Sequence, residues 1–280
     1  MGLYDDNVAV ARRTMVLFFV VDCSGSMAGS KIGAVNSAIE EIVPELSSIS
    51  ASNADSQIKI ATLAFSTGAD WVTSSPVEAE HFVWNYLEAY GVTDWGDACC
   101  QLNAKLSKND FLSDSTGSFA PAIFLMSDGE PTDDYKHGLE KLKQNNWYKK
   151  AIKVAIAIGE NANKNILAEF TGTPESVITV HHPEALKKWI KFVSVRASEI
   201  GSRSANSNSG TNTVVPPEPV PVYPGGNDGS TSNQNPSDPW SNPSDPLPEG
   251  KQTDFLDALT TEINEDDTDW GSIDDSGEVW

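Results

Sequence analysis

The chain has 280 residues and carries 40 Asp and Glu against 19 Lys and Arg, which gives a formal net charge of -21. This acidic surplus excludes a protein that binds nucleic acid or anionic membranes through non-specific charge attraction. The charge is uneven, because residues 201–280 hold 15 acidic and 2 basic residues together with 10 of the 16 prolines. Such a composition buries too little apolar surface to fold. We therefore expect one globular domain followed by a disordered acidic tail.

No apolar run in the chain is long enough to cross a membrane. The longest, Met15 to Val21, has seven residues, whereas a spanning helix needs about 20. Two acidic residues lie upstream of this run and no small-residue cleavage site follows it, so it does not match a signal peptide. The three cysteines are too sparse for a disulfide framework. We expect a cytoplasmic protein with reduced thiols.

The first elements in chain order are a strand, a helix and a second strand. Residues 15–21 are continuously apolar and end in a polar, glycine-containing loop, as a central parallel strand does. Apolar positions spaced by three and four from Ile32 to Leu46 predict a helix, with Ser30 as its N-cap. Residues 57–66 alternate like a strand, and we expect 69–73 to return antiparallel as a short edge strand.

A long connection then leads to the second half of the pattern. The predicted order is a helix at 96–108, a strand at 121–127, a helix near 134–145, a strand at 151–158, a helix near 163–171, a strand at 176–180 and a helix at 183–200. This alternation predicts an α/β fold with a doubly wound, mostly parallel central sheet, one short antiparallel edge strand and helices on both faces. In such sheets ligands bind beyond the carboxyl ends of the strands.

Composition divides the chain into four segments. Residues 1–12 are an N-terminal extension, and 13–203 form the globular domain. Residues 204–252 are a disordered linker rich in Ser, Asn, Gly and Pro, and 253–280 are the acidic tail. Within the tail, 253–263 has one apolar side and would form a short binding helix only on a partner.

Three polar loops are expected to meet at the carboxyl edge of the sheet. They supply five oxygen-bearing side chains: Asp22, Ser24 and Ser26 from the first loop, Thr93 from the second and Asp128 from the third. Mg²⁺ or Mn²⁺ suits such hard ligands, with bound waters and one open position. The alternative is that each loop merely forms a turn and caps the next helix. The presence of all three loops favours the metal site.

The order of these motifs resembles the von Willebrand factor A (VWA) domain family. In the motif DCSGS, the residues Asp22, Ser24 and Ser26 match the family pattern Asp-x-Ser-x-Ser, known as the metal-ion-dependent adhesion site (MIDAS). Thr93 in GVTDWG matches the threonine loop of the family. Asp128 in FLMSDGEPTDD matches its second aspartate.

The resemblance covers about residues 13–200, and the spellings YGVTDWGDA and IFLMSDGEPTDD are most similar to the bacterial tellurium-resistance-associated branch. Val92 stands where that branch commonly has a second glycine. The resemblance implies a cytoplasmic protein-interaction module without catalytic chemistry, whose metal binds an Asp or Glu of a protein partner. It also implies an adaptor in a bacterial stress or signalling system, associated with a serine/threonine kinase and a metal-dependent phosphatase, or with an AAA-type ATPase.

A metal-dependent hydrolase that uses the same site is the alternative function. It needs a general base, and all four histidines lie outside the three loops: His81, His137, His181 and His182. Haloacid-type phosphatases need a second Asp where this chain has Ser24, and no phosphate-binding glycine loop is present. Cys99 and Cys100 start a helix close to Thr93, where a helix N-terminus can lower a thiol pKa. We expect no enzyme.

The acidic tail admits three interpretations: a solvating appendage, a phosphorylation target or a docking peptide. Large aromatic residues favour docking: Trp240, Trp270 and Trp280. Phosphorylation would fall on hydroxyl residues that lie among acids: Thr260, Thr261, Thr268, Ser272 and Ser276. An acidic residue of 253–280 could also occupy the open metal position of its own domain.

Overall fold

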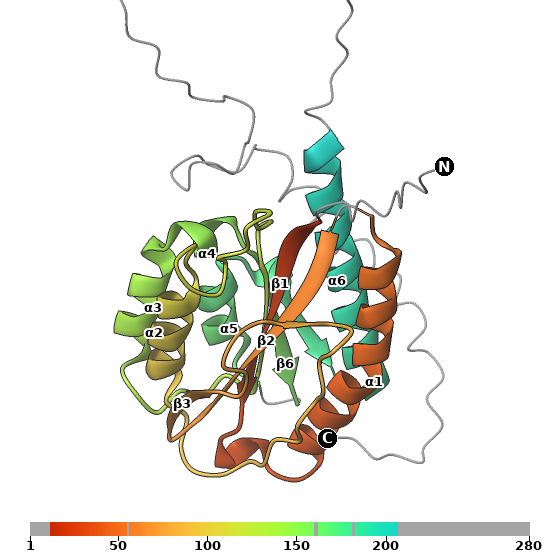
Figure 1. Cartoon of the computed structure of the whole chain (residues 1–280). Coiled ribbons are helices and arrows are strands. Elements are labelled where there is room, and N and C mark those ends of the chain that lie inside the picture. Colours follow the sequence, from red (N-terminus) through yellow and green to blue (C-terminus); the bar gives the residue numbers. More distant parts are fainter. Residues whose placement is uncertain (1–11, 55, 160–161, 181–182, 207–280) are drawn as a thin grey trace, which may run out of the picture.

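The computed structural model describes residues 12–54, 56–159, 162–180 and 183–206 (Figure 1). Nearly all of the N-terminal extension, the linker and the acidic tail, with its 253–263 segment, lie outside these described residues, as do His181 and His182. The described part contains one mostly parallel sheet with helices on both faces. The predicted fold class is therefore confirmed.

The sheet has seven strands in the order β3-β2-β1-β5-β6-β7, with β4 also paired to β2. β1, β2, β5, β6 and β7 run parallel, whereas β3 and β4 run antiparallel to β2. Their bounds are Arg13–Asp22 for β1, Ser56–Ser66 for β2, Gly68–Trp71 for β3, Val77–Glu78 for β4, Ala122–Ser127 for β5, Ile152–Ile158 for β6 and Val177–Val180 for β7. The antiparallel edge strand that we expected at 69–73 is β3.

Helices cover both faces of this sheet (Figure 1). Their bounds are Ser30–Ser52 for α1, Trp95–Lys105 for α2, Tyr135–Gln144 for α3, Asn146–Lys150 for α4, Lys164–Thr171 for α5 and Pro183–Asn206 for α6, with short 3-10 turns at Gly25–Met27 and Pro174–Ser176. α1 and α6 pack on one face, and α2 to α5 pack on the other. Among the residues that the structure describes, no helix combines the length and apolar character needed to cross a bilayer.

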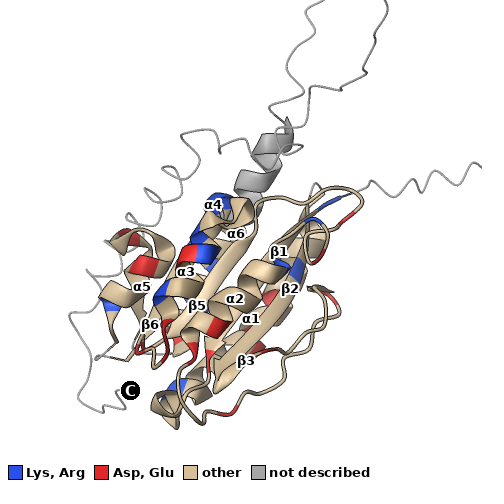
Figure 2. Cartoon of the chain, turned by 90° about the vertical axis from the view of Figure 1, so that its left-hand side faces the viewer, with Lys and Arg blue, Asp and Glu red and all other residues tan. Residues whose placement is uncertain are grey.

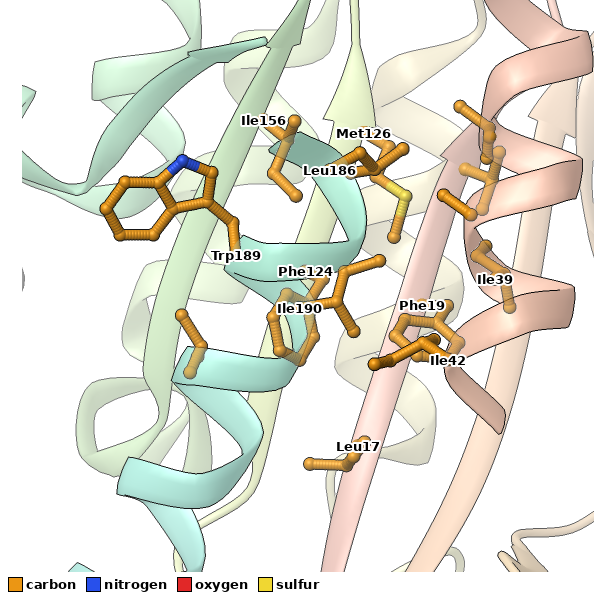
Figure 3. Close-up of a cluster of buried hydrophobic side chains, with 14 of the residues drawn as sticks. Leu17, Phe19, Ile39, Ile42, Phe124, Met126, Ile156, Leu186, Trp189 and Ile190 are labelled. Carbon is orange, nitrogen blue, oxygen red and sulfur yellow. The ribbon is translucent and has the colours of Figure 1, made fainter. Parts of the chain in front are cut away.

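The central strand β1 is buried on both faces, which explains why its sequence is continuously apolar. Leu17 and Phe19 belong to the core beneath α1 and α6, whereas Phe18 belongs to the core beneath α2 to α5. Figure 3 shows the first core, with Ile39 of α1 and Ile190 of α6 directed toward the strands between them. Packing on both sides holds the carboxyl end of β1 in the middle of the sheet edge.

Three helix boundaries differ from the sequence prediction. Ser30 is the first helical residue of α1 and not its N-cap, because the N-cap position is taken by Gly29, which has no side chain to cap the helix. α2 ends at Lys105 instead of residue 108. α6 continues to Asn206, beyond the expected end at about residue 200.

The edge of the sheet opposite the polar loops is held by Asp114. Its Oδ2 accepts hydrogen bonds from Thr14 Oγ1 at 2.6 Å and Lys59 Nζ at 2.9 Å. Its Oδ1 accepts from the backbone N–H of Thr116 at 3.0 Å. Burial alone would raise the pKa of Asp114, but hydrogen bonds from Thr14, Thr116 and Lys59 outweigh it and hold the pKa well below its usual range.

We expect Asp114→Asn to lower the free energy of unfolding at pH 7 by about 1.5–3 kcal/mol, the usual contribution of a hydrogen bond to a charged group. The folded pKa lies below the unfolded value of about 3.9, so the contribution of Asp114 is present above that pH and is lost as the pH falls below it. The gap between wild type and variant in thermal melts should therefore narrow in acid.

Asp110→Asn is the control for this measurement, since Asp110 makes only a partly exposed ion pair with Lys105 at 3.0 Å. Its effect should stay below about 1 kcal/mol. A gap between Asp114→Asn and wild type that is unchanged from pH 7 to pH 3 would contradict the prediction.

Candidate metal centre

The structure brings the two predicted acidic ligands, Asp22 and Asp128, to the same edge of the sheet. β1 ends at Asp22, and Asp128 directly follows β5. β1 and β5 are parallel neighbours, with Val21 paired to Met126, so both carboxylates lie at their shared carboxyl end. This is the position at which open α/β sheets bind ligands.

The first loop places its three oxygen-bearing side chains together. Asp22 is fully buried, and its Oδ1 accepts a hydrogen bond from the backbone N–H of Ser24 at 2.8 Å. Its Oδ2 accepts from Ser127 Oγ at 2.6 Å. The hydroxyls of Ser24 and Ser26 lie 3.0 Å apart. The carboxylate and the two hydroxyls thus form one compact group of oxygen atoms.

The electrostatic environment of Asp22 favours a cation. Burial raises the pKa of the Asp22 carboxyl, hydrogen bonds from Ser127 and Ser24 oppose the rise, and the charge of Asp128 adds to it. No Lys or Arg forms an ion pair with Asp22 among the described residues. A buried carboxylate without a counter-ion is costly, and a bound divalent cation would offset that cost.

Asp128 has one oxygen occupied and one free. Lys31 Nζ of α1 donates to Asp128 Oδ2 at 3.1 Å. Asp128 Oδ1 is buried and has no hydrogen-bond partner in the described part of the chain. An unsatisfied buried acceptor costs about 1–3 kcal/mol, and more when it is charged. This oxygen is therefore available to coordinate a cation, or to accept a hydrogen bond from a water that the cation binds.

Thr93 is buried on the second loop, which hydrogen bonds tie to the other two loops. Thr93 N donates to Thr132 Oγ1 at 3.0 Å, and Thr132 N donates to Thr93 O at 2.9 Å. Gly91 O accepts from Gly25 N at 3.1 Å, which links the second loop to the first. Gly91 has φ +72 and lies against Thr67, so a side chain there would be strained and would collide. Val92 is exposed, so its side chain needs no space inside the site.

The donor set matches a hard divalent cation. Within the described ranges no group of three or more His, Cys, Asp or Glu side chains could hold a metal ion. A cation at this edge would therefore depend on two carboxylates, on hydroxyls and on water, a mixture that Mg²⁺ accepts. The ligand roles of the five residues remain a prediction.

The structure adds supporting residues that the sequence analysis missed. Ser127 bonds Asp22, and its Oγ also accepts from Gly129 N at 2.8 Å, which orders the third loop. Lys31 contacts Asp128, and Thr132 contacts the Thr93 loop. Both contacts join residues that are far apart in the sequence, so they appear only in the folded chain. Only Ser127 carries a sequence signal, as a polar residue at the end of an apolar strand.

Cys99 is not a thiol activated by a helix N-terminus, the possibility that the sequence left open for Cys99 and Cys100. α2 begins at Trp95, so Cys99 lies beyond the first turn, and burial raises the pKa of its thiol. Burial, with a smaller contribution from Asp22, also raises the pKa of Cys23 to about 12. Cys23 and Cys99 are therefore buried packing residues.

The family model for the von Willebrand factor type A domain matches residues 17–191. The chain belongs to this family. VWA domains are modules that bind protein partners and typically carry a MIDAS motif for a divalent metal. The sequences that resemble the family's motifs lie in the loops after β1 and β5 and in the loop before α2. No curated protein matches the chain.

Several solved structures match the chain at low sequence identity. A von Willebrand factor type A protein from Catenulispora acidiphila has 17% identity and a TM-score of 0.49, covering 66% of this chain and 43% of that chain. The pilus adhesin SpaC from Lactobacillus rhamnosus GG has 12% identity and a TM-score of 0.51, covering 68% and 31%. Proximal thread matrix protein 1 from the mussel byssus, with a zinc-occupied MIDAS motif, has 18% identity and a TM-score of 0.48, covering 68% and 47%. The chain spans less than half the length of each.

Proposed function

We propose that this VWA domain is a metal-dependent protein-interaction module. One Mg²⁺ or Mn²⁺ would be held at the carboxyl edge of the sheet by Asp22, Ser24, Ser26, Thr93 and Asp128. The bound cation supplies a Lewis-acid position that accepts an Asp or Glu carboxylate from a protein partner. The observation that carries the proposal is the buried, unsatisfied Oδ1 of Asp128 beside the carboxylate of Asp22.

A binding role without catalysis is favoured over hydrolysis by the surroundings of the two described histidines. His81 is paired with Glu78 of β4, and its side chain is 74% exposed. β4 pairs with β2 near Lys59, far from the carboxyl end of that strand. His137 is an exposed residue of α3. Neither histidine belongs to the three loops of the proposed metal site, which supports a binding role over catalysis by a histidine base.

The cellular role follows from the resemblance of the second and third loops to the tellurium-resistance-associated branch. On that basis the protein is a cytoplasmic adaptor in a bacterial stress or signalling system, and its partner includes a serine/threonine kinase or a metal-dependent phosphatase. An AAA-type ATPase is the alternative partner. Each of these would present an acidic side chain to the metal.

Calorimetry on the full-length protein tests the proposal in two steps. Titration with Mg²⁺ or Mn²⁺ should reveal one site. A short capped peptide with a single Asp should then bind in the presence of Mg²⁺ and fail to bind after chelation, whereas its Asn counterpart should not bind in either case. Metal binding without any preference for the Asp peptide would contradict the interaction module, and metal-dependent hydrolysis of p-nitrophenyl phosphate would favour the hydrolase.

A further inference from the structure

A cavity of about 150 Å³ lies directly beside the metal loop. Its wall includes Cys23, the residue between Asp22 and Ser24. Tyr86 and Tyr90 also line it, and each is 61% exposed. A cavity of about this volume accommodates a group the size of benzene, so the space suits the end of one side chain from a bound partner.

The outer wall of the cavity is held in place although it contains no helix or strand. It is formed by Tyr86 to Tyr90, in the loop that leads from β3 and β4 to α2 and is coloured orange to yellow in Figure 1. Asn36 of α1 donates to Leu87 O at 2.9 Å, and its Oδ1 accepts from Leu87 N at 2.9 Å and from Trp84 Nε1 at 3.1 Å. Tyr86 is anchored by a hydrogen bond from its hydroxyl to Glu40. A surface that is ordered before binding loses less entropy when a partner docks.

The cavity is acidic as well as aromatic. Asp70 and Glu88 line it, both are exposed, and neither has an ion-pair partner among the described residues. No Lys or Arg is among its lining residues. In Figure 2 the red acidic segments gather at the lower end of the sheet, where β1, β5 and β6 finish, whereas blue segments lie mostly on α3, α4 and the first residues of β1 and β2. The cavity therefore attracts cationic groups through Asp70 and Glu88, whereas Lys31 is paired with Asp128 outside the cavity lining.

We propose that the cavity binds a basic side chain from the partner segment whose Asp or Glu completes the metal site. Tyrosine faces attract cations, and a guanidinium stacks on aromatic rings while it pairs with carboxylates, so arginine is preferred over lysine. The inference rests on the proposed function and adds the chemistry of the partner, which carries an acid and a base close together in one segment.

The acid and the base of the partner must lie close together, because Cys23 lines the cavity and is the chain neighbour of Asp22 and Ser24, two proposed metal ligands. Separations of one to three residues between the two groups are therefore the ones to test. Residues 253–280 contain no Lys or Arg. The acidic tail can thus supply a carboxylate to the metal site but no basic side chain to the cavity. This favours a separate protein as the occupant of the cavity.

Capped peptides with one Asp and one Arg, separated by one to three glycines in either order, are the probes. Control peptides carry citrulline in place of Arg, or Asn in place of Asp. With Mg²⁺, the full-length wild-type protein should bind the best Arg peptide about five- to tenfold more tightly than its citrulline counterpart. The double variant Asp70→Asn with Glu88→Gln should erase this preference while the Mg²⁺ affinity stays within about threefold.

The matched control removes the same charge elsewhere on the domain. Asp110→Asn with Glu140→Gln, on the loop after α2 and on α3, should retain the preference for Arg. Equal binding of Arg and citrulline peptides by the wild type, or an Arg preference that survives in the Asp70 and Glu88 variant, would overturn the inference. If Asp and Asn peptides bind equally while the Arg preference depends on Asp70 and Glu88, the cavity assignment stands and the metal-dependent module fails.

Discussion

Asp22→Ala should abolish Mg²⁺ and Mn²⁺ binding to the full-length protein, with a loss in affinity of more than about 100-fold. Changes to residues that only support a metal ligand already cost about 10–100-fold, and Asp22 is proposed as a direct ligand. The variant also loses the acceptor for Ser24 N and Ser127 Oγ, the two bonds that order this edge. Calorimetry measures the affinity, and circular dichroism at 25 °C checks that the variant is folded.

Thermal melts supply a second readout of the same change. A cation at 100 times its Kd stabilises the folded state by about 2.7 kcal/mol, which raises the melting temperature of a domain of this size by roughly 5 to 10 °C. The wild type should show this rise with Mg²⁺, and Asp22→Ala should show none. An equal rise in both proteins would mean that the cation binds elsewhere.

Lys31→Met should act in the opposite direction and increase the metal affinity about threefold to tenfold. Lys31 holds a positive charge 3.1 Å from Asp128 Oδ2, and this charge repels a cation at the same edge. Asp110→Asn, far from the site, is the control and should change the affinity by less than about twofold. Weaker binding by Lys31→Met would show that the lysine organises the loop more than it repels the metal.

Gly138→Ala should destabilise the domain by about 2 kcal/mol, although alanine favours a helix over glycine by about 1 kcal/mol. α2 and α3 are in backbone contact at this position, since a Cβ on Gly138 would overlap the carbonyl of Gly96 and lie 3.0 Å from its Cα. The added methyl group must push the helices apart. Because Thr93 precedes α2 and bonds Thr132 ahead of α3, the metal affinity should fall as well.

Gly33→Ala in α1 is the matched control with the opposite sign. Gly33 is exposed, and a Cβ there would meet nothing within 4 Å. Only the gain in helix propensity remains, so the variant should unfold at a slightly higher temperature, with about 1 kcal/mol of added stability. Thermal melts of the two alanine variants should move in opposite directions from the wild type. Equal shifts would contradict the close contact between α2 and α3.

Much of this fold could be predicted because a strand that is buried on both faces has a continuously apolar sequence, which is easy to recognise. The run from Met15 to Val21 is apolar without a break, since alternate residues enter two different cores. Each such strand ends abruptly in polar residues, which marks the carboxyl edge. Asp22 and Asp128 could therefore be assigned to one edge before the order of the strands was known.

The elements that escaped prediction are short or depend on tertiary contacts. β4 has 2 residues and α4 has 5, too few for a hydrophobic period to appear. One local signal for α4 is present, since Asn145 Oδ1 accepts from Trp147 N at 2.8 Å as an N-cap. The segment pinned by Asn36 has no such signal, because its hydrogen bonds join residues 51 positions apart.

The lengths of the strands constrain how another protein can join this sheet. The two longest strands, β1 with 10 residues and β2 with 11, lie inside it, whereas β3 and β7 at its margins have 4 residues each. Short margins offer few unpaired backbone groups, which protects the folded chain against edge-to-edge aggregation. They also leave little length for strand addition, in which a peptide extends a sheet through main-chain bonds. A partner that adds a strand to the described sheet would gain few main-chain hydrogen bonds. The domain must therefore distinguish its partners through side-chain contacts.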